Sequence, residues 1–236
     1  MTEQKAQMLH NVDVRERSIV KNVYVWMTAA LAITALVSYV VAANPGLMKA
    51  MLGNSFSFIL LIIAEFALVI FLSSRLESMS QNSAIGAFLA YSVLNGILFS
   101  TIFMVYSGAV ISKAFVSAAM MFAGMSVYAM TTKRDLSGWG YYLMVSLWGL
   151  IIASVMNMFF HSTGMEYLLS YLGVGIFLGL TAWDTSKLVK VNDQYGSSMD
   201  EATYTKVSIM FALSLYLDFL NIFLYLLRIF GRSSNR

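Results

Sequence analysis

Charged residues are scarce in this chain and cysteine is absent. Lysine, arginine, aspartate and glutamate make up 11% of its 236 residues, against about 25% in an ordinary soluble domain. A surface that faces water cannot be built from so few charges, so lipid must cover most of it. The lack of cysteine excludes disulfides, thiolate metal sites and cysteine nucleophiles.

Histidine and proline are almost absent. The chain has two histidines, His10 and His161, and one proline, Pro45. The histidines form neither an HExxH nor a paired metal motif, and they give a serine nucleophile no base. The net charge of +3 is scattered, without a basic block that would bind nucleic acid. We therefore predict no enzyme, no cofactor and no nucleic-acid partner.

Long apolar runs dominate what is present. Hydrophobic residues make up 59% of the chain, in runs of the roughly 20 residues that a helix needs to cross a hydrocarbon core of about 30 Å. The runs lack the period-two alternation of barrel strands, so helices must satisfy the backbone hydrogen bonds. The predicted spans are Tyr24–Ala43, Phe56–Leu72, Ala84–Tyr106, Ala109–Met130, Trp139–Phe160, Tyr167–Trp183 (or to Val189) and Val207–Phe230.

Short connections join these spans, so we predict one bundle rather than separate domains. Residues 1–23 form a charged N-terminal tail, residues 24–231 the transmembrane bundle and residues 232–236 a C-terminal tail. The segment Lys190–Thr203 is predicted to be the longest and most polar loop. Small residues four apart predict closely packed helices: Gly86 with Ala90, Gly96 with Ser100, and Gly175 with Gly179.

The distribution of lysine and arginine predicts a cytoplasmic N-terminus, because cytoplasmic loops carry more of both. With the tail inside, most basic residues between the spans also fall inside. Seven crossings would place the arginines from Arg228 onward outside, against this rule. The sequence alone leaves the last crossing open, although Val207–Phe230 is long enough to span.

Three acidic residues fall within or at the edge of spans: Glu65, Asp184 and Asp218. A carboxylate at mid-bilayer costs roughly 2.5–3.5 kcal/mol on insertion scales, so it usually faces the bundle interior and has a function. Asp218 lies near the centre of the last span. At about 100° per residue, one face of that helix carries Ser214, Asp218, Asn221, Tyr225 and Arg228. Such a polar stripe predicts a helix in the middle of the bundle.

Simpler interpretations exist for each charged residue. Asp218 could form a hydrogen bond that only fixes helix packing. Asp184 could pair locally with Lys187, three residues on. Arg75, at the end of the second span, could extend to the membrane surface.

Two segments carry a resemblance to a known family. Residues 211–231 read FALSLYLDFLNIFLYLLRIFG, and residues 179–187 read GLTAWDTSK. They resemble the last-helix and sixth-helix signatures of the Bax inhibitor-1 family, also called the transmembrane Bax inhibitor motif family, in its bacterial branch. The resemblance implies an all-α membrane protein of the bacterial inner membrane. Its seven helices would form two three-helix layers around a central C-terminal helix.

The resemblance also implies a function: a pH-sensitive calcium leak channel. Asp184 and Asp218 match the hydrogen-bonded aspartate pair that senses pH, Arg75 matches an arginine of the gate, and Glu65 matches a glutamate in the ion path. Two carboxylates in a low dielectric cannot both ionise cheaply, so such a pair would share one proton. Ca²⁺ prefers oxygen ligands, which Glu65, Asp184, Asp218 and Asn221 supply for weak, transient binding.

Two other functions compete with the channel. Some bacterial members of the family bind a membrane-bound ATP-dependent protease, and the charged N-terminal tail is the segment that would bind it here. Intramembrane aspartyl proteases also place aspartates on helices six and seven. Asp218, however, follows Tyr-Leu rather than the glycines of that motif, and Pro45 is too far away to form its Pro-Ala-Leu element.

Overall fold

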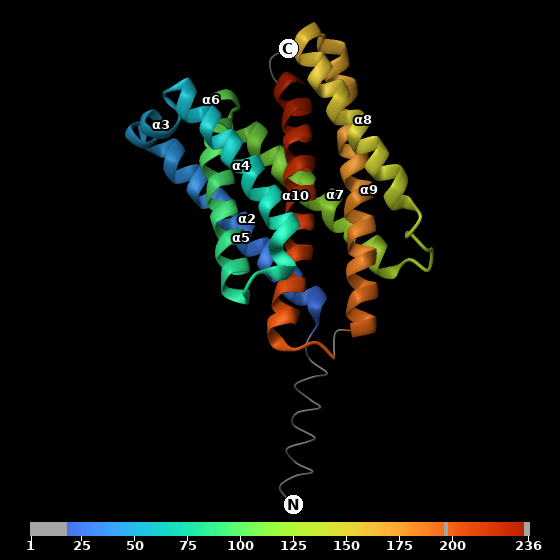
Figure 1. Ribbon diagram of the computed structural model, residues 1–236. Coiled ribbons are helices and arrows are strands. Elements are labelled where there is room, and N and C mark those ends of the chain that lie inside the picture. Colours follow the sequence, from blue (N-terminus) through green and yellow to red (C-terminus); the bar gives the residue numbers. More distant parts are fainter. Residues whose placement is uncertain (1–17, 196–197, 234–236) are drawn as a thin grey trace, which may run out of the picture.

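The described part of the chain is helical and contains no strand (Figure 1). The computed structural model describes residues 18–195 and 198–233. Residues 1–17 and 234–236, which hold most of the two predicted tails, lie outside the described residues. The helices are α2 Ile19–Ala43, α3 Pro45–Leu52, α4 Ser55–Arg75, η1 Leu76–Ser78, α5 Gln81–Phe99, α6 Ile102–Val105, α7 Gly108–Thr131, α8 Trp139–Phe160, α9 Thr163–Tyr195 and α10 Glu201–Ser233.

Seven helical segments in this part of the chain are long and apolar enough to cross a membrane. They are α2, α4 with η1, α5 with α6, α7, α8, α9 and α10. Each matches one predicted span, so the prediction of a seven-helix membrane protein is confirmed. α10 begins at the same end of the bundle as α2 and reaches the opposite end (Figure 1), which fits a last helix that crosses.

Side-chain caps set the starts of several helices. The Asn44 side chain accepts hydrogen bonds from the amides of Gly46 and Leu47, and Pro45 occupies the first helical position of α3. Proline suits that position because its missing N–H would have no helical partner there. The Asn54 side chain likewise caps α4. Two turns of helix and two caps therefore connect α2 to α4.

The predicted loop at Lys190–Thr203 is wrong at both ends, because α9 continues to Tyr195 and α10 begins at Glu201. Asn192, expected in the loop, accepts a hydrogen bond at 3.0 Å on its side-chain oxygen from the amide of Ile19. It thereby satisfies one of the unpaired N–H groups at the start of α2. α2 begins within the predicted tail, where the Ser18 side chain caps it by accepting a hydrogen bond from the amide of Lys21. The connection between α7 and α8, residues 132–138, is longer than the one between α9 and α10.

The third predicted span is interrupted. α5 ends at Phe99, and α6 forms one further turn before Tyr106. The hydroxyls of Ser100 and Thr101 donate to the carbonyls of Ile97 and Leu98, at 2.6 and 2.7 Å. Such local side-chain bonds compete with the helical ladder, and they loosen the helix near its end.

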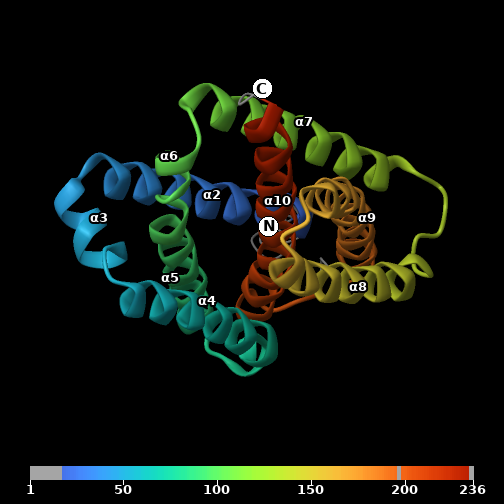
Figure 2. The same cartoon turned by 90° about the horizontal axis from the view of Figure 1, so that it is seen from above.

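α10 stands in the centre of the bundle, with α2, α4 and α5 on one side and α7, α8 and α9 on the other (Figure 2). It contacts α9, α7, α2 and α5, whereas α4 packs on α5 and α8 packs on α9. Within the window of each span that is most apolar, 67% of α10 is buried, against 6% of α4 and of α8. This packing is compatible with two three-helix layers around a central C-terminal helix.

Tyr216 anchors α10 to the first group of helices. Its hydroxyl lies 2.7 Å from the Thr34 hydroxyl of α2, and Thr34 in turn donates to the carbonyl of Ser92 on α5 at 2.9 Å. Since Thr34 has a single hydroxyl hydrogen, Tyr216 is the donor between them. The rings of Phe88 and Tyr91 pack in T-shaped arrangements with the Tyr216 ring, with ring centroids 5.9 and 6.0 Å apart. Three helices are therefore joined at one buried point.

Candidate functional site: an aspartate pair between α9 and α10

Asp218 lies in the middle of α10 and is 5% exposed. Its Oδ2 atom has no hydrogen-bond partner in the part of the chain that the structure describes. The side chain lies beside Thr181 of α9, which is fully buried. Burying a carboxylate oxygen without a hydrogen-bond partner costs free energy. A proton, a cation or a bound water at this atom would remove that cost.

Asp184 faces the same place from α9. Its charge interacts with that of Asp218, and on the other side with that of Lys187. No ion pair within 4.0 Å joins Asp184 to Lys187 among the described residues. The Lys187 ammonium instead lies 4.2 Å from the centre of the Trp183 ring. The structure therefore brings the two predicted aspartates near enough to interact electrostatically, and Lys187 interacts with Asp184 without forming an ion pair.

Close helix packing holds the two aspartate-bearing helices in this register. A Cβ atom on Gly173 of α9 would meet the Tyr225 ring of α10 at 2.5 Å. The rings of Phe177 and Tyr225 lie 6.0 Å apart. Because glycine leaves room for the tyrosine ring, α9 and α10 approach closely at this level, toward the C-terminal end of α10 from Asp218. Gly179 admits Leu143 of α8 in the same way, whereas a Cβ atom on Gly175 or Gly86 would have nothing within 4 Å.

The polar stripe of α10 continues from Asp218 toward the C-terminal end of the helix. The Asn221 side chain donates to the carbonyl of Leu217 at 2.8 Å, so its side-chain oxygen is left to accept. The Arg228 guanidinium lies 5.5 Å from the centre of the Tyr225 ring. Arg228 also lines a cavity of about 500 Å³, whose other polar residues are Ser154, Asn157, His161, Thr163 and Glu166. The stripe thus joins the aspartate pair to a polar cavity at one end of the bundle.

Glu65 and Arg75 of α4 lie apart from the aspartate pair. Glu65 is half-buried and interacts electrostatically with Tyr91 and Tyr216, on the side of α10 where the first group of helices packs. Arg75 is exposed at the end of α4. Its side chain forms no hydrogen bond or ion pair within residues 18–195 and 198–233. The roles of Glu65 in an ion path and of Arg75 in a gate stay predictions.

The described residues contain no group of three or more histidine, aspartate or glutamate side chains close enough to hold a metal ion. Asp184, Asp218 and Glu65 therefore do not form a ready calcium cage in this arrangement. Weak, transient coordination of Ca²⁺ by Glu65, Asp184, Asp218 and Asn221 stays a prediction.

Two buried partners of the site escaped the sequence analysis. Thr181 contacts Asp218, and it stands three residues before Asp184 on the same face of α9; that spacing was a usable signal. Tyr216 carries the junction with Thr34, but nothing in the sequence distinguishes it from the other tyrosines. Its role depends on two hydroxyls from distant helices.

Charged contacts outside the bilayer fix the ends of α9 and α10. The Lys190 ammonium donates to Asp135 at 2.7 Å and to the Ser137 hydroxyl at 2.6 Å. These hydrogen bonds lower the pKa of Asp135 to about 2. At the start of α10, hydrogen bonds from Thr203 lower the pKa of Asp200. The loop before α8 is thereby tied to α9, and α10 receives an acidic cap.

A seven-helix membrane bundle with an aspartate pair beside its central last helix is the class of protein that fold and site define. The model of the family described as inhibitor of apoptosis-promoting Bax1 matches residues 16–235. The chain belongs to this Bax inhibitor-1 family, and the resemblance noted in the sequence is confirmed.

Bacterial relatives match over most of their length. The inner membrane protein YbhL of Escherichia coli is 44% identical over 209 residues, which cover 89% of each chain. An uncharacterized protein of Borreliella burgdorferi is 40% identical over 235 residues, covering 100% of this chain and 98% of the relative. The uncharacterized protein YrjE of Lactococcus lactis is 39% identical over 211 residues, covering 89% and 88%.

Proposed function

We propose that this protein is a pH-sensitive calcium leak channel of the bacterial inner membrane, with its N-terminus in the cytoplasm. Asp184 and Asp218 share a proton and gate the channel. The observation that carries the proposal is the buried Asp218 Oδ2, which has no hydrogen-bond partner among the described residues although a second carboxylate lies nearby.

A shared proton gives that oxygen a role. When one carboxyl is protonated, its O–H can donate to the other carboxylate, and the pair carries a single negative charge. Loss of the proton sets two negative charges together in a low dielectric, where their repulsion is much stronger than in water. The two helices then separate, or a cation enters between them. A rise in pH thereby shifts the balance between two helix packings.

The sparse packing of α4 supports a movable gate on the other side of the bundle. α4 contacts α5 but has little buried surface, so few interactions oppose a shift of this helix. Such a shift would bring Arg75 or Glu65 toward α10. Arg75 would neutralise a deprotonated pair, and Glu65 would offer a permeating Ca²⁺ an oxygen ligand.

Calcium flux into liposomes that contain the purified protein tests the proposal. Flux is measured from about pH 5 to about pH 8, the range in which a shared carboxyl proton would be lost. Asp184→Asn and Asp218→Asn keep the side-chain shape but remove the titrating group. Asp193→Asn, on the exposed end of α9, is the matched control.

We expect native flux to change with pH and both site variants to lose that dependence, while Asp193→Asn keeps it. A pH dependence that persists in both site variants would remove the aspartate pair from the gate. If the flux is no higher than in protein-free liposomes at any pH, the proposed channel function is wrong. The N-terminal tail would then be tested for binding to a membrane-bound ATP-dependent protease.

A further inference from the structure

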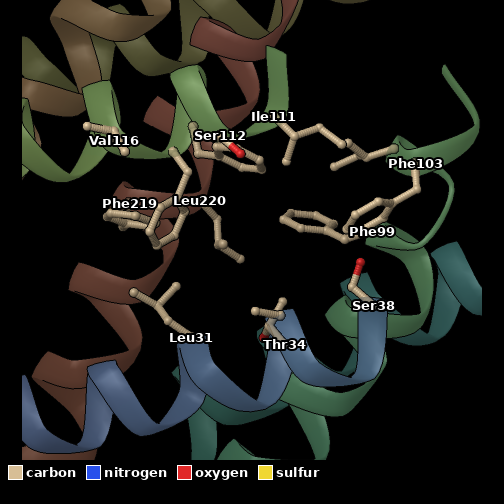
Figure 3. Close-up of a pocket in the computed structure, with 14 residues that line it drawn as sticks. Leu31, Thr34, Ser38, Phe99, Phe103, Ile111, Ser112, Val116, Phe219 and Leu220 are labelled. Carbon is tan, nitrogen blue, oxygen red and sulfur yellow. The ribbon is translucent and has the colours of Figure 1, made fainter. Parts of the chain in front are cut away.

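An apolar cavity of about 390 Å³ lies beside α10, and neither aspartate of the pair lines it (Figure 3). Side chains of four segments line it: Leu31, Thr34 and Ser38 of α2, Phe99 and Phe103 next to the break before α6, Ile111, Ser112 and Val116 of α7, and Phe219 and Leu220 of α10. An engineered apolar cavity of about 150 Å³ stays dry and binds benzene. This one is larger, so an apolar ligand can occupy it.

The cavity has the form of a window between α2 and α7. The two helices meet at one level, where the rings of Tyr24 and Phe122 lie 6.5 Å apart. Farther along, the segments from Leu31 to Ser38 and from Ile111 to Val116 face each other across the cavity (Figure 3). Phe219, Leu220 and Phe223 of α10 line the cavity as well. Three of the lining side chains are also exposed on the surface: Phe103, Phe115 and Val116.

The bilayer is the solvent at this depth. All the lining residues belong to membrane spans, and the three hydroxyl groups of Thr34, Ser38 and Ser112 are the polar part of the lining. Thr34 already bonds to Tyr216 and Ser92. Water therefore gains little from entering, whereas an empty space would cost the surrounding side chains their dispersion contacts. A hydrocarbon chain from the adjacent leaflet fills the space without leaving the membrane.

A basic residue stands where the headgroup of such a lipid would lie. Lys113 is exposed in the second turn of α7, next to Ser112 of the cavity lining. Its ammonium lies 4.6 Å from the centre of the Phe230 ring, two turns along α10 from Phe223, which also lines the cavity. Lysine near a helix end reaches the membrane surface and attracts lipid phosphate. The Lys113 ammonium therefore matches the phosphate of a phospholipid, and the apolar window matches one of its acyl chains.

We infer that this window binds one acyl chain of a bilayer phospholipid, whose phosphate pairs with Lys113. Ala35 lines the cavity next to Thr34 and is also exposed on the surface. Ala32 is exposed one turn earlier on the same helix but lies outside the lining. Ala35→Phe fills the window, and Ala32→Phe adds the same ring to a lipid-facing surface.

The test uses the full chain in nanodiscs of phosphatidylethanolamine and phosphatidylglycerol. A trace of phosphatidylglycerol with a photoreactive diazirine in its acyl chain is added, and the labelled peptides are mapped by mass spectrometry. We expect labelling concentrated on the lining segments of α2, α7 and α10. In the Ala35→Phe variant most of this labelling should be lost, and in the Ala32→Phe variant it should be unchanged. In the Lys113→Gln variant the labelling should be weaker than in the native protein.

Other results would overturn the inference. Equal labelling of Ala35→Phe and Ala32→Phe, or labels spread evenly over the exposed faces of α4 and α8, would mean that the window holds no lipid preferentially. Crosslinks between two copies of the chain at the same segments would show that a second protein molecule covers it. Thermal unfolding of each variant in the same nanodiscs separates a blocked window from a misfolded protein.

Discussion

α4 and α10 are both long apolar helices, yet they occupy opposite environments. α4 has the highest hydropathy of the spans in the described part of the chain and is among the least buried, whereas α10 is the most buried. In a membrane, lipid tails are as apolar as leucine, so hydrophobicity does not drive a helix inward. Small residues, aromatic contacts and the polar stripe hold α10 in the centre, and lipid replaces such contacts around α4.

The largest difference between the two helices is expected when an aromatic side chain is removed from each. Tyr216→Ala removes a fully buried ring and its bond to Thr34, and we expect a loss of about 3–5 kcal/mol in unfolding free energy. Phe66 of α4 is 62% exposed, so Phe66→Ala should stay within about 0.5 kcal/mol. Reversible unfolding in mixed micelles with increasing SDS measures both. Equal losses at the two positions would break the comparison.

Glycine-to-alanine substitutions on α5 test how closely the helices pack. Their expected effect on stability is smaller than that of Tyr216→Ala. A Cβ atom on Gly96 of α5 would lie 2.7 Å from Val37 Cβ and 2.9 Å from the backbone oxygen of Thr34. Because α2 must shift to accept it, Gly96→Ala should cost about 1–3 kcal/mol. Gly86 on the same helix has nothing within 4 Å, so Gly86→Ala should gain up to about 1 kcal/mol from helix propensity. The same unfolding assay checks the sign of each change.

The carboxylates of the two helices should differ in function. Glu65→Gln on α4 is expected to lower calcium flux, because it removes the negative charge of a carboxylate from the ion path. The pH dependence of the flux should remain, because the aspartate pair is intact. Asp218→Asn is expected to abolish that dependence. Flux against pH in liposomes, with the two variants at equal protein density, distinguishes these outcomes. A Glu65→Gln variant that no longer responds to pH would place Glu65 in the sensor instead.

The smallest effect is expected outside the bilayer, at the exposed pair of Asp135 and Lys190. Since the pKa of folded Asp135 is lowered from 3.8 to about 2, the pair stabilises the fold above about pH 4, and that contribution is lost as the pH falls toward 2. Asp135→Asn should therefore reduce stability slightly at neutral pH and match the native protein near pH 2. Thermal unfolding midpoints across this range measure the difference. A constant difference at all pH values would contradict the charge contact.

Much of the fold could be predicted from the sequence, because each span depends on a local run of residues. The stripe of Asp218 and Asn221 predicted the central place of α10, and the structure confirms it. The end of α9 was missed, since the contact of Asn192 with the start of α2 joins residues far apart in the sequence. The break before α6 was missed as well, because the hydroxyls of Ser100 and Thr101 compete with the backbone.

The sequence by itself determined that this protein spans the membrane, how often it does so and which helix is central. Tertiary structure alone decided that Asp218 meets Asp184 and Thr181 while Glu65 faces Tyr216 on another side, and that α2 and α7 diverge around an apolar window. The physical reason is that hydropathy and periodicity are properties of one helix. Which side chains meet depends on how closely two helices can approach, and small residues such as Gly96 and Gly173 set that distance.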